Sequence, residues 1–215
     1  MAVAATGAIF LDRDGVINEN RPDHVKNWDE FEFLPEVLPS ICRLTEIGMP
    51  IFVVTNQAVI ARKQVTEEAL YDIHCRMNKM VTQAGGHIDK IYYCPHDHDD
   101  ACDCRKPNPG MLKQAAAEFS IDLTRSFMVG DAWTDMEAGM SVGAHSILVM
   151  TGRGRSQGNL ARCLTDYPVR FGVACDLADA TTMILSTLDG KPMKTTPRFR
   201  SAFHMALSPY EITVL

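Results

Sequence analysis

The sequence lacks the segments that would place it in a membrane or carry it out of the cell. It has no uninterrupted apolar stretch of about 18 residues, the minimum for a helix that spans a bilayer. The segment Met1–Phe10 has no basic region of the kind that begins a signal peptide, and Asp12-Arg13-Asp14 follows at once where small neutral residues would belong. We therefore expect a soluble cytoplasmic protein that does not act at a membrane.

Positive charge is scarce as well. Lys and Arg total 21 against 27 Asp and Glu, which gives a net charge of -6, and no long basic run offsets it. Nucleic acids and anionic membranes attract clusters of Lys and Arg, so the composition argues against both partners. The 215-residue chain has an ordinary globular composition. We expect a monomer with one domain over residues 1–188 and a tail, 189–215, with little structure of its own.

The seven cysteines form an odd set that does not suit a disulfide framework in a chain without an export signal. Cys94, His96, Cys102 and Cys104 lie within eleven positions and supply the four ligands of a closed, structural zinc site. Such a site would staple the loop 94–104, with His98 as a rival ligand to His96. The alternative is a group of reduced surface cysteines beside incidental histidines. The remaining cysteines are expected to be small buried apolar residues: Cys42, Cys75, Cys163 and Cys175.

Short apolar runs alternate with helical patterns along the chain. The runs predict buried strands at 8–11, 51–54, 88–93, 127–129, 146–150 and 171–174. A helix-forming period places Val37, Ile41 and Leu44 on one face, and a second period does so for Leu70, Ile73, Met77, Met80 and Val81. Asn108 and Pro109 have the form of an N-cap and a first helical residue. The alternation predicts an α/β fold with a parallel sheet.

Polar side chains follow several of these runs, at the edge where open α/β sheets bind ligands. Asp12 and Asp14 follow the first run, Thr55 and Asn56 the second, and Asp131 and Asp135 the fourth, while Arg105 and Lys106 stand just before the helix expected at Asn108. Together they supply a carboxylate nucleophile, acids that can hold Mg²⁺, and a cation and hydroxyl for phosphate oxygens. The sequence therefore indicates phosphoryl transfer on a small phosphorylated metabolite.

Each of these groups has a simpler interpretation when taken alone. Asp12 and Asp14 could form a turn, Thr55-Asn56 could cap a helix, and the later acids could begin one. An EF-hand is set aside, because Val16 and Ile17 stand where an oxygen ligand and Gly belong. The segment Gly152–Arg155 is expected to be a loop. A phospho-accepting signalling module and a zinc module that binds nucleic acid remain the alternatives from other classes.

As a set, the motifs resemble those of a known family. Asp12-Arg13-Asp14-Gly15, Thr55-Asn56-Gln57, Arg105-Lys106-Pro107 and Gly130-Asp131 with Asp135 resemble the four motifs of the haloacid-dehalogenase superfamily of phosphatases. The inserted Cys-Pro-His and Cys-Asp-Cys-Arg-Lys-Pro resemble its zinc-bearing branch, which includes the D-glycero-D-manno-heptose 1,7-bisphosphate 7-phosphatases and the histidinol-phosphate phosphatases. The resemblance spans residues 8–154.

The resemblance implies a Rossmann-like sheet without a large cap domain, and roles for the acids. Asp12 would be the nucleophile, and Asp14 the general acid and then the base. Mg²⁺ would be held by the Asp12 carboxylate, the Asp14 backbone carbonyl and Asp131. The leading substrate is the heptose bisphosphate at its 7-phosphate, and histidinol phosphate or another sugar phosphate is the alternative.

The resemblance also implies a set of residues for the phosphate and the substrate. Thr55, Asn56 and Lys106 would bind the transferred phosphoryl group. Arg105 would bind the substrate, and Asp135 would orient Lys106 or a metal-bound water.

Overall fold

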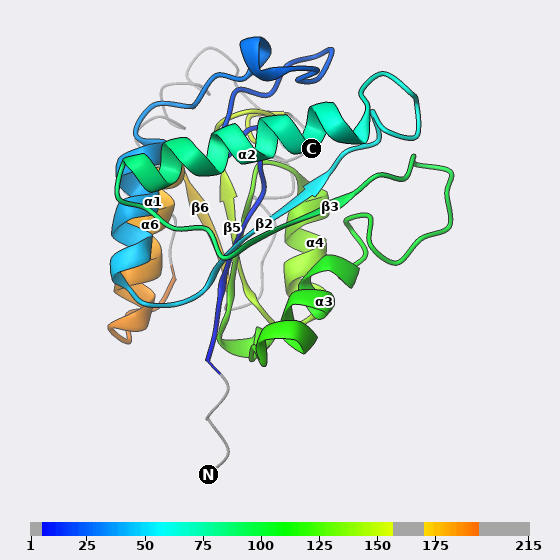
Figure 1. Ribbon diagram of the computed structural model, residues 1–215. Coiled ribbons are helices and arrows are strands. Elements are labelled where there is room, and N and C mark those ends of the chain that lie inside the picture. Colours follow the sequence, from blue (N-terminus) through cyan, green and yellow to red (C-terminus); the bar gives the residue numbers. More distant parts are fainter. Residues whose placement is uncertain (1–5, 157–169, 194–215) are drawn as a thin grey trace, which may run out of the picture.

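The centre of the molecule is a parallel β-sheet of six strands, seen in the computed structural model, which describes residues 6–156 and 170–193 (Figure 1). The strand order is β3-β2-β1-β4-β5-β6. The predicted strands and the α/β fold class are confirmed. The strands are β1 (Ile9–Leu11), β2 (Ile51–Asn56), β3 (Lys90–Cys94), β4 (Phe127–Gly130), β5 (His145–Val149) and β6 (Phe171–Ala174).

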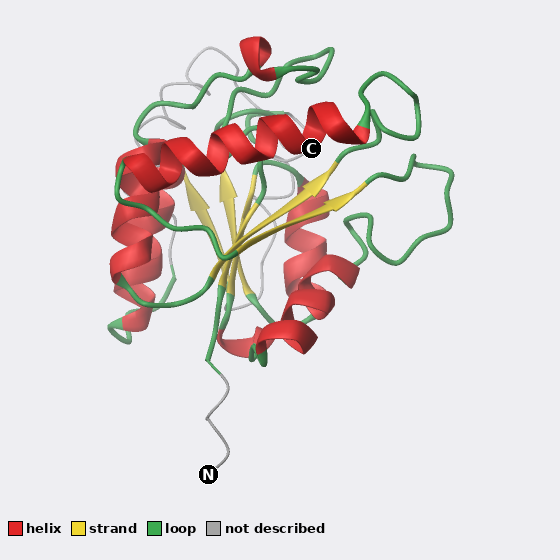
Figure 2. Ribbon diagram, in the orientation of Figure 1, coloured by secondary structure: helices red, strands yellow, loops and turns green. Residues whose placement is uncertain are grey.

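Helices cover both faces of the sheet and make a three-layer arrangement (Figure 2). On one face lie α1 (Val37–Glu46), α2 (Glu67–Gln83) and α6 (Leu177–Leu188). On the other lie α3 (Gly110–Phe119) and α4 (Trp133–Ser141). Two short 3₁₀ turns complete the described elements, η1 (Trp28–Glu30) and η2 (Leu123–Arg125).

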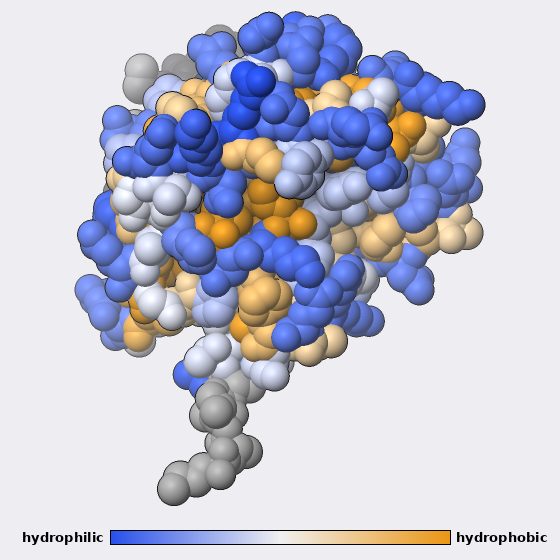
Figure 3. Space-filling model, in the orientation of Figure 1, coloured by the Kyte–Doolittle hydropathy of each residue, from blue (hydrophilic) through white to orange (hydrophobic). Residues whose placement is uncertain are grey.

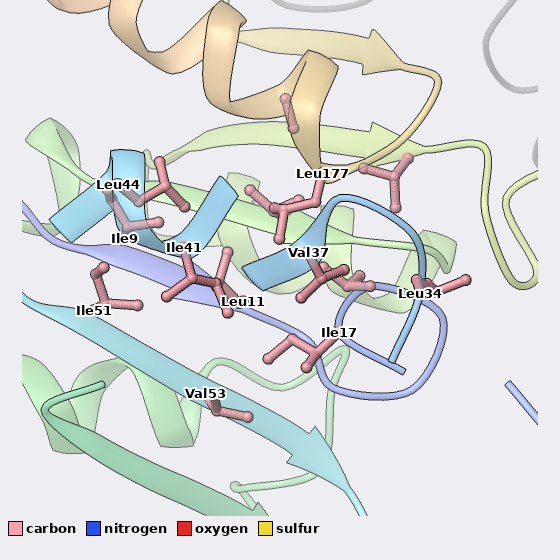
Figure 4. Close-up of a cluster of buried hydrophobic side chains, with 14 of the residues drawn as sticks. Ile9, Leu11, Ile17, Leu34, Val37, Ile41, Leu44, Ile51, Val53 and Leu177 are labelled. Atoms are coloured by element: carbon pink, nitrogen blue, oxygen red, sulfur yellow. The ribbon is translucent and has the colours of Figure 1, made fainter. Parts of the chain in front are cut away.

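The alternation of side chains along the strands builds a core on each side of the sheet. Ile9 and Leu11 of β1 point toward α1 and pack against Ile41 and Leu44 (Figure 4). Phe10, between them, belongs to the opposite core, where its ring lies 5.4 Å from that of Phe52. Burying such a side chain contributes about 1.5–3 kcal/mol. The surface contrasts with this core: the face seen in Figure 3 is mostly hydrophilic.

Two helix predictions need correction. Met80 was expected on the buried face of α2, but it is 40% exposed, because it lies to one side of the stripe that faces the sheet. Asn108 was expected to cap α3, but the helix begins one residue later than predicted, at Gly110. The Asn108 side chain instead donates to the carbonyl of Cys102 at 2.7 Å, which ties it to the loop 94–104, called the Cys/His loop below.

The expectation for the other cysteines was wrong in part. Cys75 is exposed on α2, and Cys42 and Cys175 are only partly buried. Cys163 lies outside the described residues, as does most of the predicted tail, 194–215. Within the described ranges, no helix combines the length and the apolar character that crossing a membrane requires.

The strand order places a topological switch beside β1, which has β2 on one side and β4 on the other. Connections from neighbouring strands leave in opposite directions at such a point and open a crevice beyond the carboxyl ends. Asp12 follows β1, Asp131 follows β4, and Thr55 and Asn56 end β2. The fold thus directs these residues to one edge of the sheet.

Candidate active site

A cavity of about 510 Å³ opens at this edge of the sheet. It contains all the residues that the sequence singled out for phosphoryl transfer. They are Asp12, Asp14, Thr55, Asn56, Arg105, Lys106, Asp131 and Asp135.

Lys106 is the buried cation of this cavity, with only 3% of its surface exposed. Its Nζ lies 2.9 Å from Asp12 Oδ1 and 2.6 Å from Asp135 Oδ1, and it donates to the carbonyl of Val54 at 2.7 Å. Burial alone would lower the pKa of Lys106, but the two carboxylates outweigh it and hold that pKa above its usual value. The ammonium is therefore charged and fixed beside Asp12.

Asp12, Asp131 and Asp135 crowd together, with ligand oxygens that lie within 4.8 Å of one another. Burial, and then the neighbouring carboxylates, raise the pKa of Asp131 to about 8. Burial also raises the pKa of Asp12 to about 6, although Lys106 opposes the shift. The ammonium of Lys106 sets one positive charge against these three carboxyl groups. The remaining negative charge and the oxygen donors fit a divalent cation such as Mg²⁺.

Two glycines let the backbone approach Asp131. Gly15 has a φ of +87°, and a Cβ built on it would lie 2.1 Å from Asp131 Oδ2. Gly152 has a φ of +51°, and its Cβ would lie 2.2 Å from the same oxygen. A side chain at either position would therefore displace the carboxylate.

Asp14 is held as a carboxylate by a ring of donors. Arg13 Nη2 donates to both of its oxygens at 2.9 Å, Asn18 Nδ2 donates at 2.9 Å, and Gln57 Nε2 donates at 2.8 Å. Burial tends to raise the pKa of Asp14, but the charge of Arg13 and these hydrogen bonds leave it below its usual value. Gln57 also donates to Thr55 Oγ1 at 2.9 Å, so one amide connects the ends of β1 and β2.

Asn56 and Arg105 are both bound to neighbouring loops. The amide of Asn56 donates to the carbonyl of Lys106 and accepts from its N–H, each at 3.0 Å. Arg105 donates through Nη1 to the carbonyl of His96 at 3.2 Å. Asn56 therefore fixes the backbone of Lys106, and Arg105 joins the cavity to the Cys/His loop.

The Cys/His loop brings four ligand atoms together. Cys94 Sγ lies 3.8 Å from Cys102 Sγ, 3.1 Å from Cys104 Sγ and 3.5 Å from His96 Nδ1, which is 3.2 Å from Cys104 Sγ. A tetrahedral zinc site sets two sulfurs about 3.8 Å apart, and a sulfur and a nitrogen about 3.6 Å apart. The side chain of His98 is 86% exposed and stands outside the cluster. The donor set around His96 thus fits zinc.

Sequence motifs did not single out several residues of the site. Asn20 Nδ2 and the Arg153 N–H donate to Asp131 Oδ2 at 3.2 and 2.7 Å. Arg62 forms a paired contact with Asp97 of the Cys/His loop, at 2.7 and 2.6 Å. The predicted loop at 152–155 is confirmed. These contacts come from connecting segments whose paths the local pattern does not determine. Among the residues that were missed, Arg13 alone carried a signal in the sequence, since its charged side chain stands between the site acids Asp12 and Asp14.

Comparisons with known proteins point to one family. Residues 103–180 match the model of the HAD-hydrolase-like family. The chain is 42% identical over 146 residues to a D-glycero-β-D-manno-heptose-1,7-bisphosphate 7-phosphatase of Pseudomonas aeruginosa, over 68% of this chain and 82% of that one. A protein of the same name from Neisseria meningitidis serogroup A is 42% identical over 147 residues, with 68% and 79% covered.

Solved structures point to the same family. The D,D-heptose 1,7-bisphosphate phosphatase of Bordetella bronchiseptica, complexed with magnesium and phosphate, has a TM-score of 0.78 and 38% identity, over 85% of this chain and 99% of that one. The corresponding enzyme of Burkholderia thailandensis has a TM-score of 0.63 and 31% identity, over 84% and 99%. The chain therefore belongs to the haloacid-dehalogenase-like hydrolase family, in the group that includes the D-glycero-β-D-manno-heptose-1,7-bisphosphate 7-phosphatases.

Proposed function

We propose that this chain is a phosphatase that removes the 7-phosphate from D-glycero-β-D-manno-heptose 1,7-bisphosphate. The observation that carries the proposal is the convergence of Asp12, Lys106 and Asp131 in one cavity at the switch point of the sheet. The names of the relatives at 42% identity support the choice of substrate.

Asp12 is the proposed nucleophile. Its carboxylate oxygen attacks phosphorus, so that a bond forms between Asp12 and the phosphoryl group while the bond to the sugar oxygen breaks. Lys106, 2.9 Å from Asp12, neutralises negative charge on the transferred group, and Thr55 and Asn56 bind its oxygens. Asp135, 2.6 Å from Lys106, keeps the ammonium in place.

Asp14 is the proposed acid and base. Its pKa is lowered in the free protein, so it must first take up a proton from solvent, which it then gives to the departing sugar oxygen. As a carboxylate again, it takes a proton from the water that attacks the phosphorus of the aspartyl phosphate. That second step releases inorganic phosphate and regenerates Asp12. The cavity includes both carboxyl groups, as this division of work requires.

Mg²⁺ would be held by the Asp12 carboxylate, the Asp14 backbone carbonyl and Asp131. When bound, it offsets the repulsion between the Asp12 carboxylate and the anionic phosphate. The crowding of acids around Asp131, and the magnesium and phosphate in the Bordetella bronchiseptica relative, support this proposal.

Zinc would be held by Cys94, His96, Cys102 and Cys104 and would have a structural role, since four protein ligands leave no open position. It would fix the loop 94–104, to which Arg105 is hydrogen-bonded, and so place this guanidinium for the substrate. Action as a monomer in the cytoplasm, with residues 1–188 as the phosphatase domain, stays a prediction.

The test is a substrate panel with phosphate release as the readout and Mg²⁺ present. The panel contains the heptose 1,7-bisphosphate, histidinol phosphate and other sugar phosphates. We expect the heptose bisphosphate to give the highest kcat/KM. Asp12→Asn should abolish turnover with the fold retained, whereas Asp29→Asn, at an exposed acid of η1, should not. Retained activity in Asp12→Asn, or full activity in excess EDTA, would overturn the mechanism.

A further inference from the structure

The side chain of Arg13 is fully buried, although it carries a permanent charge. Its Nη2 donates to both oxygens of Asp14 at 2.9 Å, and its Nη1 lies 3.1 Å from Nε2 of His74. Among the described residues, Nε of Arg13 has no hydrogen-bond partner. The orientation of the guanidinium is therefore set by Asp14 on one side and by His74 on the other.

His74 reaches Arg13 from α2, more than sixty residues along the chain. An arginine can only donate, so Nε2 of His74 must accept, and the neutral ring carries its proton on Nδ1. Burial, and then the neighbouring Arg13 charge, lower the pKa of His74 to about 3, which agrees with a neutral ring. A neutral acceptor at this position satisfies Nη1 of the guanidinium. Because it carries no charge, it does not weaken the ion pair between Arg13 and Asp14.

The position of His74 is itself well fixed. The residue is 7% exposed, and its ring lies 6.1 Å from that of Tyr93. Its neighbours Ile73 and Met77 are fully buried in the core beneath α2. In Figure 1, α2 crosses the sheet close to the level where the strands end. The helix therefore offers a rigid point from which Arg13 can be held independently of Asp14.

We infer that His74 is a positioning residue for the phosphatase reaction: it fixes the guanidinium of Arg13, which in turn holds the Asp14 carboxyl group at the cavity. The inference rests on the proposed function, in which a proton passes from Asp14 to the sugar oxygen as the bond from phosphorus to that oxygen breaks and the bond to Asp12 forms. Transfer of this kind depends closely on the placement of the acid.

The experiment compares two substrates that differ in their need for a proton. The heptose oxygen leaves as a strongly basic alkoxide unless it is protonated, whereas p-nitrophenolate leaves as a stable anion. The ratio of kcat/KM for the heptose bisphosphate to kcat/KM for p-nitrophenyl phosphate therefore falls when the acid is displaced, and the KM for the heptose bisphosphate shows separately whether substrate binding has changed. A loss that is merely structural lowers both values and leaves the ratio unchanged.

His74→Leu removes the acceptor, and His74→Gln retains one. We expect His74→Leu to lower the ratio about tenfold or more, part of the factor that general acid catalysis supplies. His74→Gln should recover most of this loss. If His74→Leu cannot be purified in folded form, His74→Met takes its place. Met77→Ala, which leaves a cavity on the same face of α2, should leave the ratio unchanged.

Asp14→Asn separates the two ways in which the experiment can fail. If Asp14→Asn lowers both kcat/KM values equally, the acid role in the proposed function is wrong. If Asp14→Asn lowers the ratio but His74→Leu does not, or His74→Gln behaves like His74→Leu, the role of His74 is wrong and the proposed function stands.

Discussion

The ammonium group of Lys106 lies 2.6 Å from the carboxylate of Asp135, although one residue follows the Cys/His loop and the other lies in the first turn of α4. Asp135 also accepts the N–H of Ala132 at 3.0 Å and so closes the start of this helix. A single carboxylate thus caps α4 and holds Lys106 beside Asp12. The stability of the fold and the chemistry of the site are coupled through Lys106, because its ammonium compensates the charge of Asp12 as well as that of Asp135.

Lys106→Met should destabilise the metal-free protein by about 3–5 kcal/mol, because the buried acids lose their compensating charge. Added Mg²⁺ should restore part of this loss. Lys90→Met is the matched control, since Lys90 pairs with Glu118 at the surface, where such pairs contribute about 1 kcal/mol or less. Urea unfolding with and without Mg²⁺ measures both variants. Equal losses in the two variants would contradict the importance of the buried pair.

Gly15→Ala should reduce Mg²⁺ affinity as well as stability. The added Cβ would lie 2.1 Å from Asp131 Oδ2, so the carboxylate must move. Gly48→Ala provides the control, because Gly48 has a similar φ of +75° but nothing within 4 Å of its Cβ. It should show only the backbone strain of a non-glycine residue in the left-handed region, about 1–2 kcal/mol. Calorimetric titration with Mg²⁺ and thermal unfolding measure the two effects, and an unchanged affinity in Gly15→Ala would refute the expectation.

The sequence predicted the sheet and the cavity well for a physical reason. Buried parallel strands are near-continuous apolar runs, and polar residues directly after them must meet at the carboxyl edge. Asp12, Thr55 and Asp131 were predicted in this way. Lys106 was predicted from its place just before the helix expected at Asn108. The cluster of Cys94, His96, Cys102 and Cys104 was found through its short spacing.

The contacts that were missed depend on tertiary geometry. His74 falls within a helical period whose other members are apolar core residues, so nothing local marks it as a partner of Arg13. The expected cap at Asn108 failed because its amide binds Cys102 across a folded loop, which local propensity does not describe. Met80 lies next to the buried stripe of α2, where periodicity fixes the face only within about one position.

Replacement of both Cys102 and Cys104 by Ala should remove zinc and impair turnover. These residues contribute two of the four clustered donors, and the loop carries the carbonyl of His96 that accepts from Arg105. Cys75→Ala, at an exposed thiol on α2, should retain both zinc and activity. Elemental analysis of the purified protein should give a near-stoichiometric amount of zinc in the wild type. A clearly lower amount would contradict the site.

The affinity for Mg²⁺ should rise with pH in two stages. The cation binds ionised carboxylates, and the pKa values of Asp12 and Asp131 in the metal-free protein are raised to about 6 and about 8. Below pH 6 binding must displace a proton from both groups, between pH 6 and 8 only from Asp131, and above pH 8 from neither.

The measurable consequence is the slope of affinity against pH. The dissociation constant for Mg²⁺ should fall about tenfold per pH unit between pH 6 and 8, more steeply below pH 6, and level off above pH 8. Isothermal titration in buffers with different heats of ionisation gives both the constant and the number of protons released. Binding with no proton release at pH 7 would show that Asp131 is already ionised, and that another positive charge stabilises it in the metal-free site.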